Sequence, residues 1–395
     1  MSRIMRSAAR GPTTTVYQRP ADGAILFYLE DDSGAGVSGK VYSTDDLSWD
    51  DVPAPDTSLK SGPDFLWFDE WGGRRIFCRG TNEHLFYLYM KDDGGSTPLK
   101  LGDFDGDSWS ESHVVNCNYP FTWSLGVDSE NRTAISYFDC GVGREKIYFQ
   151  HDAHVGTLEI VDNSNATIIA INSDDLVYII YTAGDLLFGP PMGLYYKTYN
   201  PDTDTLSGEN TIWEEDDTAT QILTDIDAEV DTEDNVHIIF TRVTLAAPGG
   251  AQLSSAPYHM VIGDVSPELI DNSSTWMKSE SLAIDNDNNL NVALLVGGDS
   301  GVTLTGAQEP INFIQKPYGG SWGSLEDVGG VGGYLGLVSN STGEFFIVYD
   351  RGDGGARRVY YMEKPSGGEW TGETTVSELD WGYPNVIHDQ FPRTS

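Results

Sequence analysis

One pattern of short apolar segments and polar turns recurs from about Asp64 to the C-terminus of this 395-residue chain. Each copy holds a short apolar stretch, a turn rich in Asp, Asn and Gly, a strongly apolar stretch, and then an aromatic stretch. Short apolar runs that are bounded by turn residues and rich in β-branched and aromatic side chains are typical of strands buried on both faces. The spacing of about fifty to sixty residues fits one four-stranded blade of a β-propeller.

The repeat predicts where the strands of each copy lie. Second strands are expected at 76–79, 134–138, 176–181, 236–240, 291–296 and 345–349, and third strands at 85–90, 146–151, 193–198, 256–261, 311–316 and 358–363. The turns before the second strands are marked by Asp69, Asp128, Ser173, Asp231, Asp285 and Ser339. A tryptophan is expected to open the fourth strand at Trp109, Trp213, Trp276, Trp322 and Trp370, and residues 154–161 take that place in one copy.

A further copy is split between the two ends of the chain. Residues 24–29 and 40–44 read as its second and third strands, Trp49 opens a fourth, and residues 385–389 supply the missing first strand. Pairing of the chain ends would close a ring and remove exposed sheet edges. The sequence therefore predicts an all-β, seven-bladed propeller with four antiparallel strands per blade, as one domain over residues 22–395.

The charge of the chain is strongly acidic. Asp and Glu total 61 and Lys and Arg total 23, which gives a net charge of −38. At molar salt the Debye length falls to about 3 Å, so mutual repulsion of the carboxylates is screened. This composition resembles that of proteins from extreme halophiles; the alternative is that the Asp residues serve turns. Nucleic acid is not expected as a partner, because its phosphates would be repelled.

Residues 1–21 differ from the rest because they are basic. They carry Arg3, Arg6, Arg10 and Arg19, and the first acid is Asp22. One interpretation is a disordered tail; the one favoured here is an arm that docks on an acidic surface of its own or a neighbouring chain, within a larger assembly or homo-oligomer. No apolar run follows the arginines, so neither a secretory signal nor membrane insertion is expected. The three cysteines predict no disulfide framework.

The strand rhythm over residues 14–390 resembles that of the sialidase-like (BNR-repeat) propellers. Ser43, Asp45 and Trp49 form a degenerate version of the family's Asp-box, one residue short and without its glycine. The resemblance implies a disc with a central funnel, where ligands bind. It implies no activity, because such folds carry both enzymes and plain binding proteins.

Sialidase chemistry requires three converging arginines, a Tyr nucleophile with a supporting Glu, and an acid/base Asp. Between residues 80 and 350 the arginines are few, namely Arg132, Arg144 and Arg242. A polysaccharide lyase would need a His or Tyr base near an arginine, and His151 and His154 are better explained as solvated residues at a strand end. No catalytic residue is predicted.

The segment 102–111, GDFDGDSWSE, is the sharpest local motif. It presents Asp103, Asp105, Asp107 and Glu111, and hard cations such as Ca²⁺ bind loops of this kind through six to eight oxygens. The segment resembles the FG-GAP calcium loop of integrin-type propellers, from which it departs at Ser108 and Glu111. The alternative is an Asp-rich hairpin without metal.

Aromatic residues cluster just before several first strands. The connection between blades reaches a rim of the funnel, where exposed rings would stack on sugars. The candidates for glycan contact are Trp67, Tyr119, Trp123, Tyr334, Trp381 and Tyr383. Packing between neighbouring blades is the alternative.

Two functions follow from these observations. The first is a non-enzymatic structural or binding propeller on the virion surface of a virus of halophilic archaea, as a capsid decoration, turret or tail-fibre component that contacts host surface glycans. The second is a secreted or surface glycosidase or polysaccharide lyase, with its site in the funnel.

Overall fold

The computed structural model describes the strands and most of the turns that join them. The described residues are 24–29, 37–43, 48–52, 77–79, 84–90, 99–105, 108–115, 120–139, 144–151, 154–162, 164–183, 193–214, 220–247, 251–297, 309–333, 335–339, 343–353, 356–376 and 385–388. Within these ranges every regular element is a β-strand. The same ranges hold no helix of the length and apolarity that a bilayer-crossing segment needs.

The strands form antiparallel sheets, mostly of four strands that follow one another in the chain. Their members are β1 (Ala24–Leu29), β2 (Val37–Ser43) and β3 (Ser48–Val52) with β29 (Asn385–His388); β4 (Phe77–Arg79), β5 (Leu85–Met90), β6 (Leu99–Phe104) and β7 (Trp109–Val115); β8 (Pro120–Val127), β9 (Thr133–Asp139), β10 (Arg144–His151) and β11 (His154–Asp162); β12 (Ser164–Ile171), β13 (Val177–Ala183) and β14 (Gly193–Asn200) with β15 (Thr205–Leu206) and β16 (Asn210–Glu214); and β25 (Leu335–Ser339), β26 (Phe345–Asp353), β27 (Ala356–Lys364) and β28 (Thr374–Thr375).

One sheet is longer because two four-stranded units touch. Its members are β17 (Gln221–Val230), β18 (Val236–Leu245), β19 (Gln252–Val261), β20 (Glu268–Leu269), β21 (Trp276–Ile284), β22 (Leu290–Gly297), β23 (Glu309–Lys316) and β24 (Glu326–Gly332). Among the described residues, the strand pairing between the two units is limited to a parallel bridge between Ser255 of β19 and Trp276 of β21. Every other pairing in this sheet is antiparallel.

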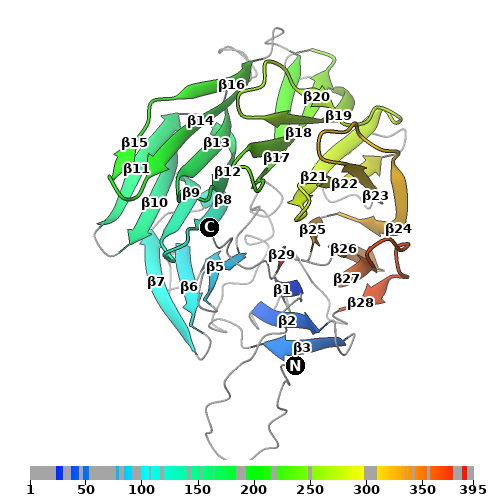
Figure 1. Ribbon diagram of the computed structural model, residues 1–395, viewed down its shortest axis with the longest axis horizontal. Helices are drawn as coiled ribbons and strands as arrows, with labels where there is room; N and C mark the ends of the chain where they lie inside the picture. The colour runs from blue at the N-terminus through cyan, green and yellow to red at the C-terminus, as the bar shows by residue number, and fades with distance from the viewer. Residues whose placement is uncertain are drawn as a thin grey trace, which may run out of the picture.

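The sheets radiate from a common centre, as Figure 1 shows. Their innermost described strands contact one another in the cyclic order β4, β8, β12, β17, β21, β25 and β29, and β29 contacts β4. The first and last strands of the chain also pair, with Ala24 opposite His388 and Phe27 opposite Asn385. The predicted pairing of the chain ends is therefore present, and the fold is a β-propeller.

Neighbouring sheets pack face to face through apolar side chains. Ile168 and Ile180 of one sheet lie in the same buried cluster as Leu223, Ile238 and Phe240 of the next. Burial of a side chain of this size contributes about 1.5–3 kcal/mol relative to exposure. The continuous apolar runs of the predicted second strands reflect this burial on both faces of each sheet.

Four of the five tryptophans expected to open a fourth strand do not open one. Trp213 lies near the end of β16. Trp276 begins β21, the innermost strand of the following unit, and the outer strand of the unit before it is the two-residue β20. Trp322 and Trp370 lie in the loops before β24 and β28, where their rings contact those of His259 and Phe313. Trp109 does open β7.

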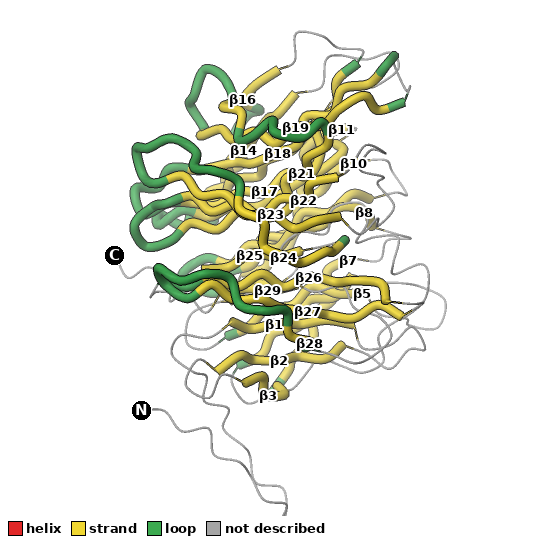
Figure 2. The backbone as a smooth tube through the Cα atoms, turned by 90° about the vertical axis from the view of Figure 1, so that its right-hand side faces the viewer, coloured by secondary structure: helices red, strands yellow, loops and turns green. Residues whose placement is uncertain are grey.

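Hydrogen bonds between successive turns tie the sheets together on one face. Because strands alternate in direction, the turns after first strands and those after third strands share this face, and Figure 2 shows the longest described loops gathered on one side. In each turn the fourth residue has a positive φ: 65° at Asn131, 60° at Asp175, 65° at Asp234 and 60° at Asn288. Asn and Asp tolerate this backbone region better than other side chains.

We call the contact between two such turns a turn clasp. The second residue of one turn donates its backbone N–H and its hydroxyl to the fourth residue of the next turn: Ser129 to Asp175, Ser173 to Asp234, and Thr232 to Asn288, at 2.6–3.0 Å. The Asp and Asn residues that mark the repeat therefore serve two purposes. They allow the tight turn, and they bind it to its neighbour.

Candidate functional site

A cleft opens between the unit β21–β24 and the unit β25–β28, on the face that carries the turn clasps. One wall is the turn at 285–289, between β21 and β22, and the other is the loop at 364–367, after β27. Phe313, Gln315, Gly343 and Phe345 complete the lining, and the cleft measures about 380 Å³. This volume lies at the small end of the range of about 300–1,000 Å³ that is usual for ligand pockets.

The turn at 285–289 is rigidly built. Oδ1 of the buried Asp285 accepts hydrogen bonds from the backbone N–H groups of Asp287 and Asn289, at 3.0 and 2.9 Å, and its Oδ2 accepts from the Asn289 amide. Oδ1 of Asn289 accepts in turn from the backbone N–H of Tyr318 at 3.0 Å. These bonds hold Asp287 at the tip of the turn, where its side chain is exposed.

The opposite wall is one of two loops with the same sequence pattern, Lys-Pro-x-Gly-Gly-x-Trp, at 316–322 and 364–370. Both loops turn through a glycine with positive φ, 66° at Gly319 and 70° at Gly367. In each loop the second glycine donates its N–H to the proline carbonyl at 2.8 Å. The shared glycine conformation and hydrogen bond define the backbone of this wall. Ser366 is exposed at the tip of the loop.

The lysine in the cleft is already engaged. Lys364 forms an ion pair with Glu326 of β24, and its ammonium lies 5.1 Å from the centre of the Phe313 ring and 5.8 Å from that of Trp370. Lys316 repeats the arrangement with Glu268 and Trp322. Ion pairing and aromatic contact together fix the lysine as part of the wall.

Chemically, the lining of the cleft is mostly polar. The Asp287 carboxylate and the Ser366 hydroxyl stand at its two walls, Gln315 contributes an amide, and Phe313 and Phe345 contribute the aromatic part of the lining. Several polar groups beside aromatic rings suit a ligand that has both hydroxyl groups and C–H faces. The sequence analysis did not predict this cleft, because its walls come from segments that are far apart in the chain.

The predicted calcium loop is only partly described. Oδ1 of Asp103 lies 2.7 Å from Nδ1 of His84, Oδ1 of Asp105 accepts from the Ser108 N–H, and Glu111 pairs with Lys100 at 3.2 Å. The register places Asp103 opposite Ser110 and Glu111 opposite Gly102. Asp103 and Glu111 therefore leave opposite faces of the hairpin and do not converge.

No group of three or more His, Cys, Asp or Glu side chains able to hold a metal ion occurs in the part of the chain that the structure describes. Asp107 lies outside that part, so calcium binding by Asp103, Asp105, Asp107 and Glu111 stays a prediction.

The predicted glycan-contacting aromatic residues lie mostly outside the described ranges. Trp67, Tyr119, Tyr334, Trp381 and Tyr383 are in this group, as are the arm residues Arg3, Arg6, Arg10 and Arg19. Trp123 lies in β8, an innermost strand, where its backbone pairs with Tyr137. Its ligand-binding role stays a prediction.

Two of the arginines considered for a sialidase clamp, Arg132 and Arg242, make other contacts in separate sheets. Arg132 binds acidic residues at the junction of two sheets, and the Arg242 guanidinium lies 5.7 Å from the Trp213 ring centre in a different sheet. Arg144 lies in β10.

The pair formed by Tyr349 and Glu373 is structural. Tyr349 donates a hydrogen bond to Glu373, and Arg351 contacts the same carboxylate at 2.6 Å. Tyr349 is fully buried, and a Cβ built on Gly330 of the neighbouring sheet would come within 2.9 Å of its hydroxyl. Burial, together with the hydrogen bond to Glu373, raises the pKa of the phenol far above its ordinary value. A phenol so enclosed has no room for a substrate and resists deprotonation, so it lacks the properties of a nucleophile.

No protein-family model matches this chain, and no curated protein matches it. Solved structures match it in shape. A protein from Lactobacillus plantarum aligns with a TM-score of 0.55 at 10% identity, covering 93% of this chain and 99% of its own. A candidate 6-phosphogluconolactonase from Bacteroides uniformis aligns with a TM-score of 0.54 at 11% identity, covering 92% of this chain and 99% of its own.

A fungal lectin from Aleuria aurantia, a six-bladed β-propeller, aligns with a TM-score of 0.45 at 9% identity, over 76% of this chain and 94% of its own. Identities this low bear on the fold alone. The chain belongs to the class of β-propeller proteins.

Proposed function

We propose that this chain is a non-enzymatic, seven-bladed β-propeller that binds glycans. The observation that carries the proposal is the cleft between the turn at 285–289 and the loop at 364–367, whose lining combines Asp287, Ser366 and Gln315 with the rings of Phe313 and Phe345. Sugars present hydroxyl groups for carboxylate, hydroxyl and amide partners, and C–H faces for aromatic ones. Catalysis by a tyrosine nucleophile is left out of the proposal because Tyr349, which is paired with Glu373, is packed between sheets.

The contacts of the inner strands support the proposed blade number. The unit β17–β20 and the unit β21–β24 count as separate blades, because their described strands pair with each other only at the bridge between Ser255 and Trp276. With the unit completed by β29, the cyclic order of inner strands then supports seven blades.

The wider setting of the proposal is a virion surface in a high-salt environment, where the chain is one subunit among others. The net charge of −38 and the basic segment at residues 1–21 support it. A subunit with an acidic body and a basic arm can attach to another copy of itself by charge complementarity.

Glycan binding is tested by exposing the full chain to an array of neutral and acidic glycans in 3 M KCl. We expect binding to a subset of the array and no turnover of the bound glycans, which chromatography of recovered ligand would check. An Asp287→Ala variant is expected to bind at least about tenfold more weakly, because one charge-assisted hydrogen bond contributes about 1.5–3 kcal/mol. Asp264→Ala, in the exposed turn before β20, is the matched control. Cleavage of a glycan by the chain would overturn the non-enzymatic assignment.

Assembly through the arm is tested by sedimentation velocity at 1 M and 3 M KCl. The full chain is expected to sediment as an oligomer, and a chain that lacks residues 1–21 as a monomer. The effect should weaken with rising salt, because exposed charges are screened within about 3 Å at 1 M. A variant with Arg3, Arg6, Arg10 and Arg19 all replaced by glutamine separates charge from length. Equal sedimentation of all three chains would refute the role of the arm.

A further inference from the structure

The cleft lies where the series of turn clasps is interrupted. The turns at 128, 172, 231 and 285 are joined in succession by the clasps of Ser129, Ser173 and Thr232. At the next junction Asn286 takes the place of the donating Ser or Thr, and Gly343 takes the place of the accepting Asp or Asn. Gly343 keeps the positive φ of that position, 79°, but has no side chain to receive the clasp.

The absence of a side chain at Gly343 has a direct geometric consequence. Asn286 and Gly343 both line the cleft, together with Asp287 and Ser366. In the preceding junction the same space is filled by the Asn288 side chain, whose amide nitrogen and oxygen both contact the Thr232 hydroxyl, at 2.7 and 2.9 Å. The glycine therefore leaves vacant the volume that a clasp occupies elsewhere in the ring.

The charges around the cleft restrict what it can bind. Asp285 and Asp287 place two carboxylates on one wall, and Lys364 is paired with Glu326. None of the other lining residues is cationic. A carboxylate or phosphate on a ligand would face repulsion from Asp287 without a compensating cation, whereas hydroxyl groups can donate charge-assisted hydrogen bonds to the same oxygens.

We propose that the missing clasp at Gly343 creates the binding site, and that its ligand is the uncharged, hydroxyl-rich end of a glycan. The inference rests on the proposed glycan-binding function and adds to it a ligand class and the residue that opens the site. Asp287 accepts hydrogen bonds from ligand hydroxyls on one wall, and Ser366 exchanges hydrogen bonds with the ligand on the other. The small volume of about 380 Å³ suits the terminal part of a glycan rather than a long stretch of it.

Restoring the clasp tests the proposal. In an Asn286→Thr, Gly343→Asn double variant, Thr and Asn take the positions that Thr232 and Asn288 occupy in the preceding junction. Asparagine suits the positive φ at 343, as it does at Asn131 and Asn288. A Cβ at Gly343 would lie 3.5 Å from Oγ of Ser366, an ordinary contact, so the backbone can accept the side chain.

Binding is measured by calorimetric titration in 3 M KCl with methyl α-mannopyranoside, methyl α-glucopyranoside and methyl β-galactopyranoside, and with glucuronic acid and N-acetylneuraminic acid as acidic probes. The chain is expected to bind one or more of the neutral glycosides and neither acid. The double variant should lose at least about tenfold in affinity while its melting temperature stays equal or rises, because it gains a clasp.

Gly319→Asn is the matched control, because it makes the same replacement at another glycine with a positive φ, 66°. Gly319 lies in the loop at 316–322, and a Cβ there meets nothing within 4 Å. This control should bind as the parent chain does. Unchanged affinity in the double variant, or preference for the acidic probes, would overturn the inference and leave the glycan-binding function standing. Failure of the parent chain to bind any probe here or on the array would overturn both.

Discussion

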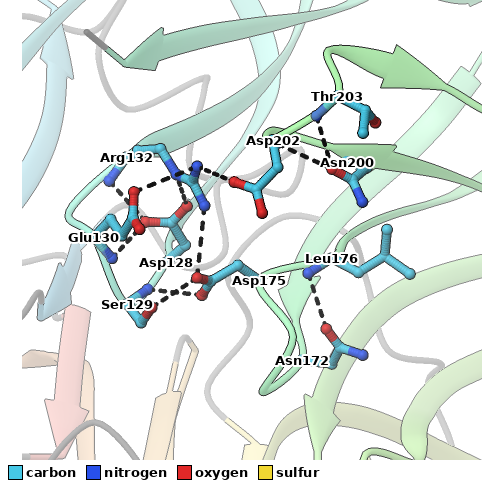
Figure 3. A network of polar contacts seen from close by, with 10 residues as sticks. All are labelled: Asp128, Ser129, Glu130, Arg132, Asn172, Asp175, Leu176, Asn200, Asp202 and Thr203. Carbon is cyan, nitrogen blue, oxygen red and sulfur yellow. Dashed lines mark hydrogen bonds and ion pairs between the residues drawn. The ribbon is translucent and has the colours of Figure 1, made fainter.

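Replacement of Arg132 by alanine is expected to lower the free energy of unfolding by about 3 kcal/mol. Figure 3 shows why: the guanidinium lies among carboxylates from both sides of a sheet junction. Nε contacts Asp128 at 2.5 Å, Nη1 contacts Asp202 at 2.6 Å, and Nη2 lies 3.5 Å from Asp175. The Asp128 side chain is only 2% exposed and that of Arg132 is 14% exposed, so the alanine variant leaves a buried carboxylate without its counter-charge.

The arginine remains charged under all ordinary conditions. Burial alone would lower the pKa of its guanidinium, but hydrogen bonds with Asp202 and Asp128 raise the pKa above its ordinary value. Asp175 also accepts the turn clasp from Ser129, so the loss of Arg132 loosens the clasp as well as the ion pair. Arg132 therefore adds ion pairs to the clasp and the apolar contacts that join the sheets β8–β11 and β12–β16.

Urea denaturation followed by tryptophan fluorescence, at 0.5 M and 3 M KCl, measures the effect. The difference between parent and Arg132→Ala should shrink at high salt, where screening relieves repulsion among the exposed acids, yet persist because Asp128 is buried. Glu130→Gln is the control: the Glu130 side chain is 67% exposed and 3.5 Å from the guanidinium, so its loss should cost less than about 1 kcal/mol. Equal stability of the parent and the alanine variant at both salt concentrations would contradict this account.

Much of this architecture is readable from the sequence, because the repeat rests on local chemistry. Asp128, Asp231 and Asp285 mark tight turns whose carboxylates accept backbone N–H groups within five residues of chain. The apolar runs that follow them are strands buried on both faces. The pairing of residues 385–388 with 24–27 was predictable because each end lacked the strands that the other supplied.

The parts that the sequence did not predict depend on contacts between sheets. Asp202 approaches Arg132 from a loop after β14, seventy residues further along the chain, and nothing local marks the pair. The cleft at Gly343 depends on a partner turn at 285–289. Even so, the turn alignment contains the signal: Gly343 is the residue at which the Asp or Asn of the preceding turns is missing, and the pattern Lys-Pro-x-Gly-Gly-x-Trp occurs twice.

Comparison of the blades also reveals a pair of histidines. His237 and His259 occupy the positions that Tyr178 and Tyr196 occupy in the preceding unit. His237 and Tyr178 each lie six residues after the first residue of the turn, at 231 and 172. His259 pairs with Ile239 as Tyr196 pairs with Ile180. Their rings stack at 5.3 Å, and His237 Nδ1 lies 3.0 Å from His259 Nε2. His237 Nε2 lies 3.1 Å from the buried Asp231 carboxylate, so it donates to Asp231 and His259 donates to His237.

Acidification is expected to destabilise the propeller through this pair before most carboxylates titrate. Burial, with repulsion from His237 and Lys316, lowers the pKa of His259 to about 3. Burial also lowers the pKa of His237, although the hydrogen bond that His237 donates to Asp231 and the charges of Asp231 and Asp264 oppose this shift. Both histidines titrate near pH 6.5 when unfolded, so the unfolded chain binds more protons below that pH.

The sign of the effect follows from this proton uptake. The stability contributed by the neutral pair is fully present above about pH 6.5 and is lost as the pH falls from there toward the folded pKa values. The loss amounts to about 1.4 kcal/mol per pH unit for each histidine that stays neutral in the folded chain. Urea denaturation at 3 M KCl, repeated between pH 7.5 and 5, should therefore show a free energy of unfolding that declines steadily below pH 6.5.

The matched variant is His237→Tyr, His259→Tyr, which copies the Tyr178–Tyr196 ring pair of the neighbouring unit, whose centroids are 6.0 Å apart. Its absolute stability is not the readout, because the larger rings must be accommodated. The readout is the slope of the free energy of unfolding against pH between pH 6.5 and 5. In the double-tyrosine variant this slope should be smaller than in the parent chain by about 1.4–2.7 kcal/mol per pH unit, which corresponds to one or two fewer protons bound on unfolding. His113→Gln, at an exposed position of β7, should leave the slope as in the parent chain. A parent slope that survives in the double-tyrosine variant would assign the acid sensitivity to the carboxylates instead, and the histidine pair would then be no more than packing between β18 and β19.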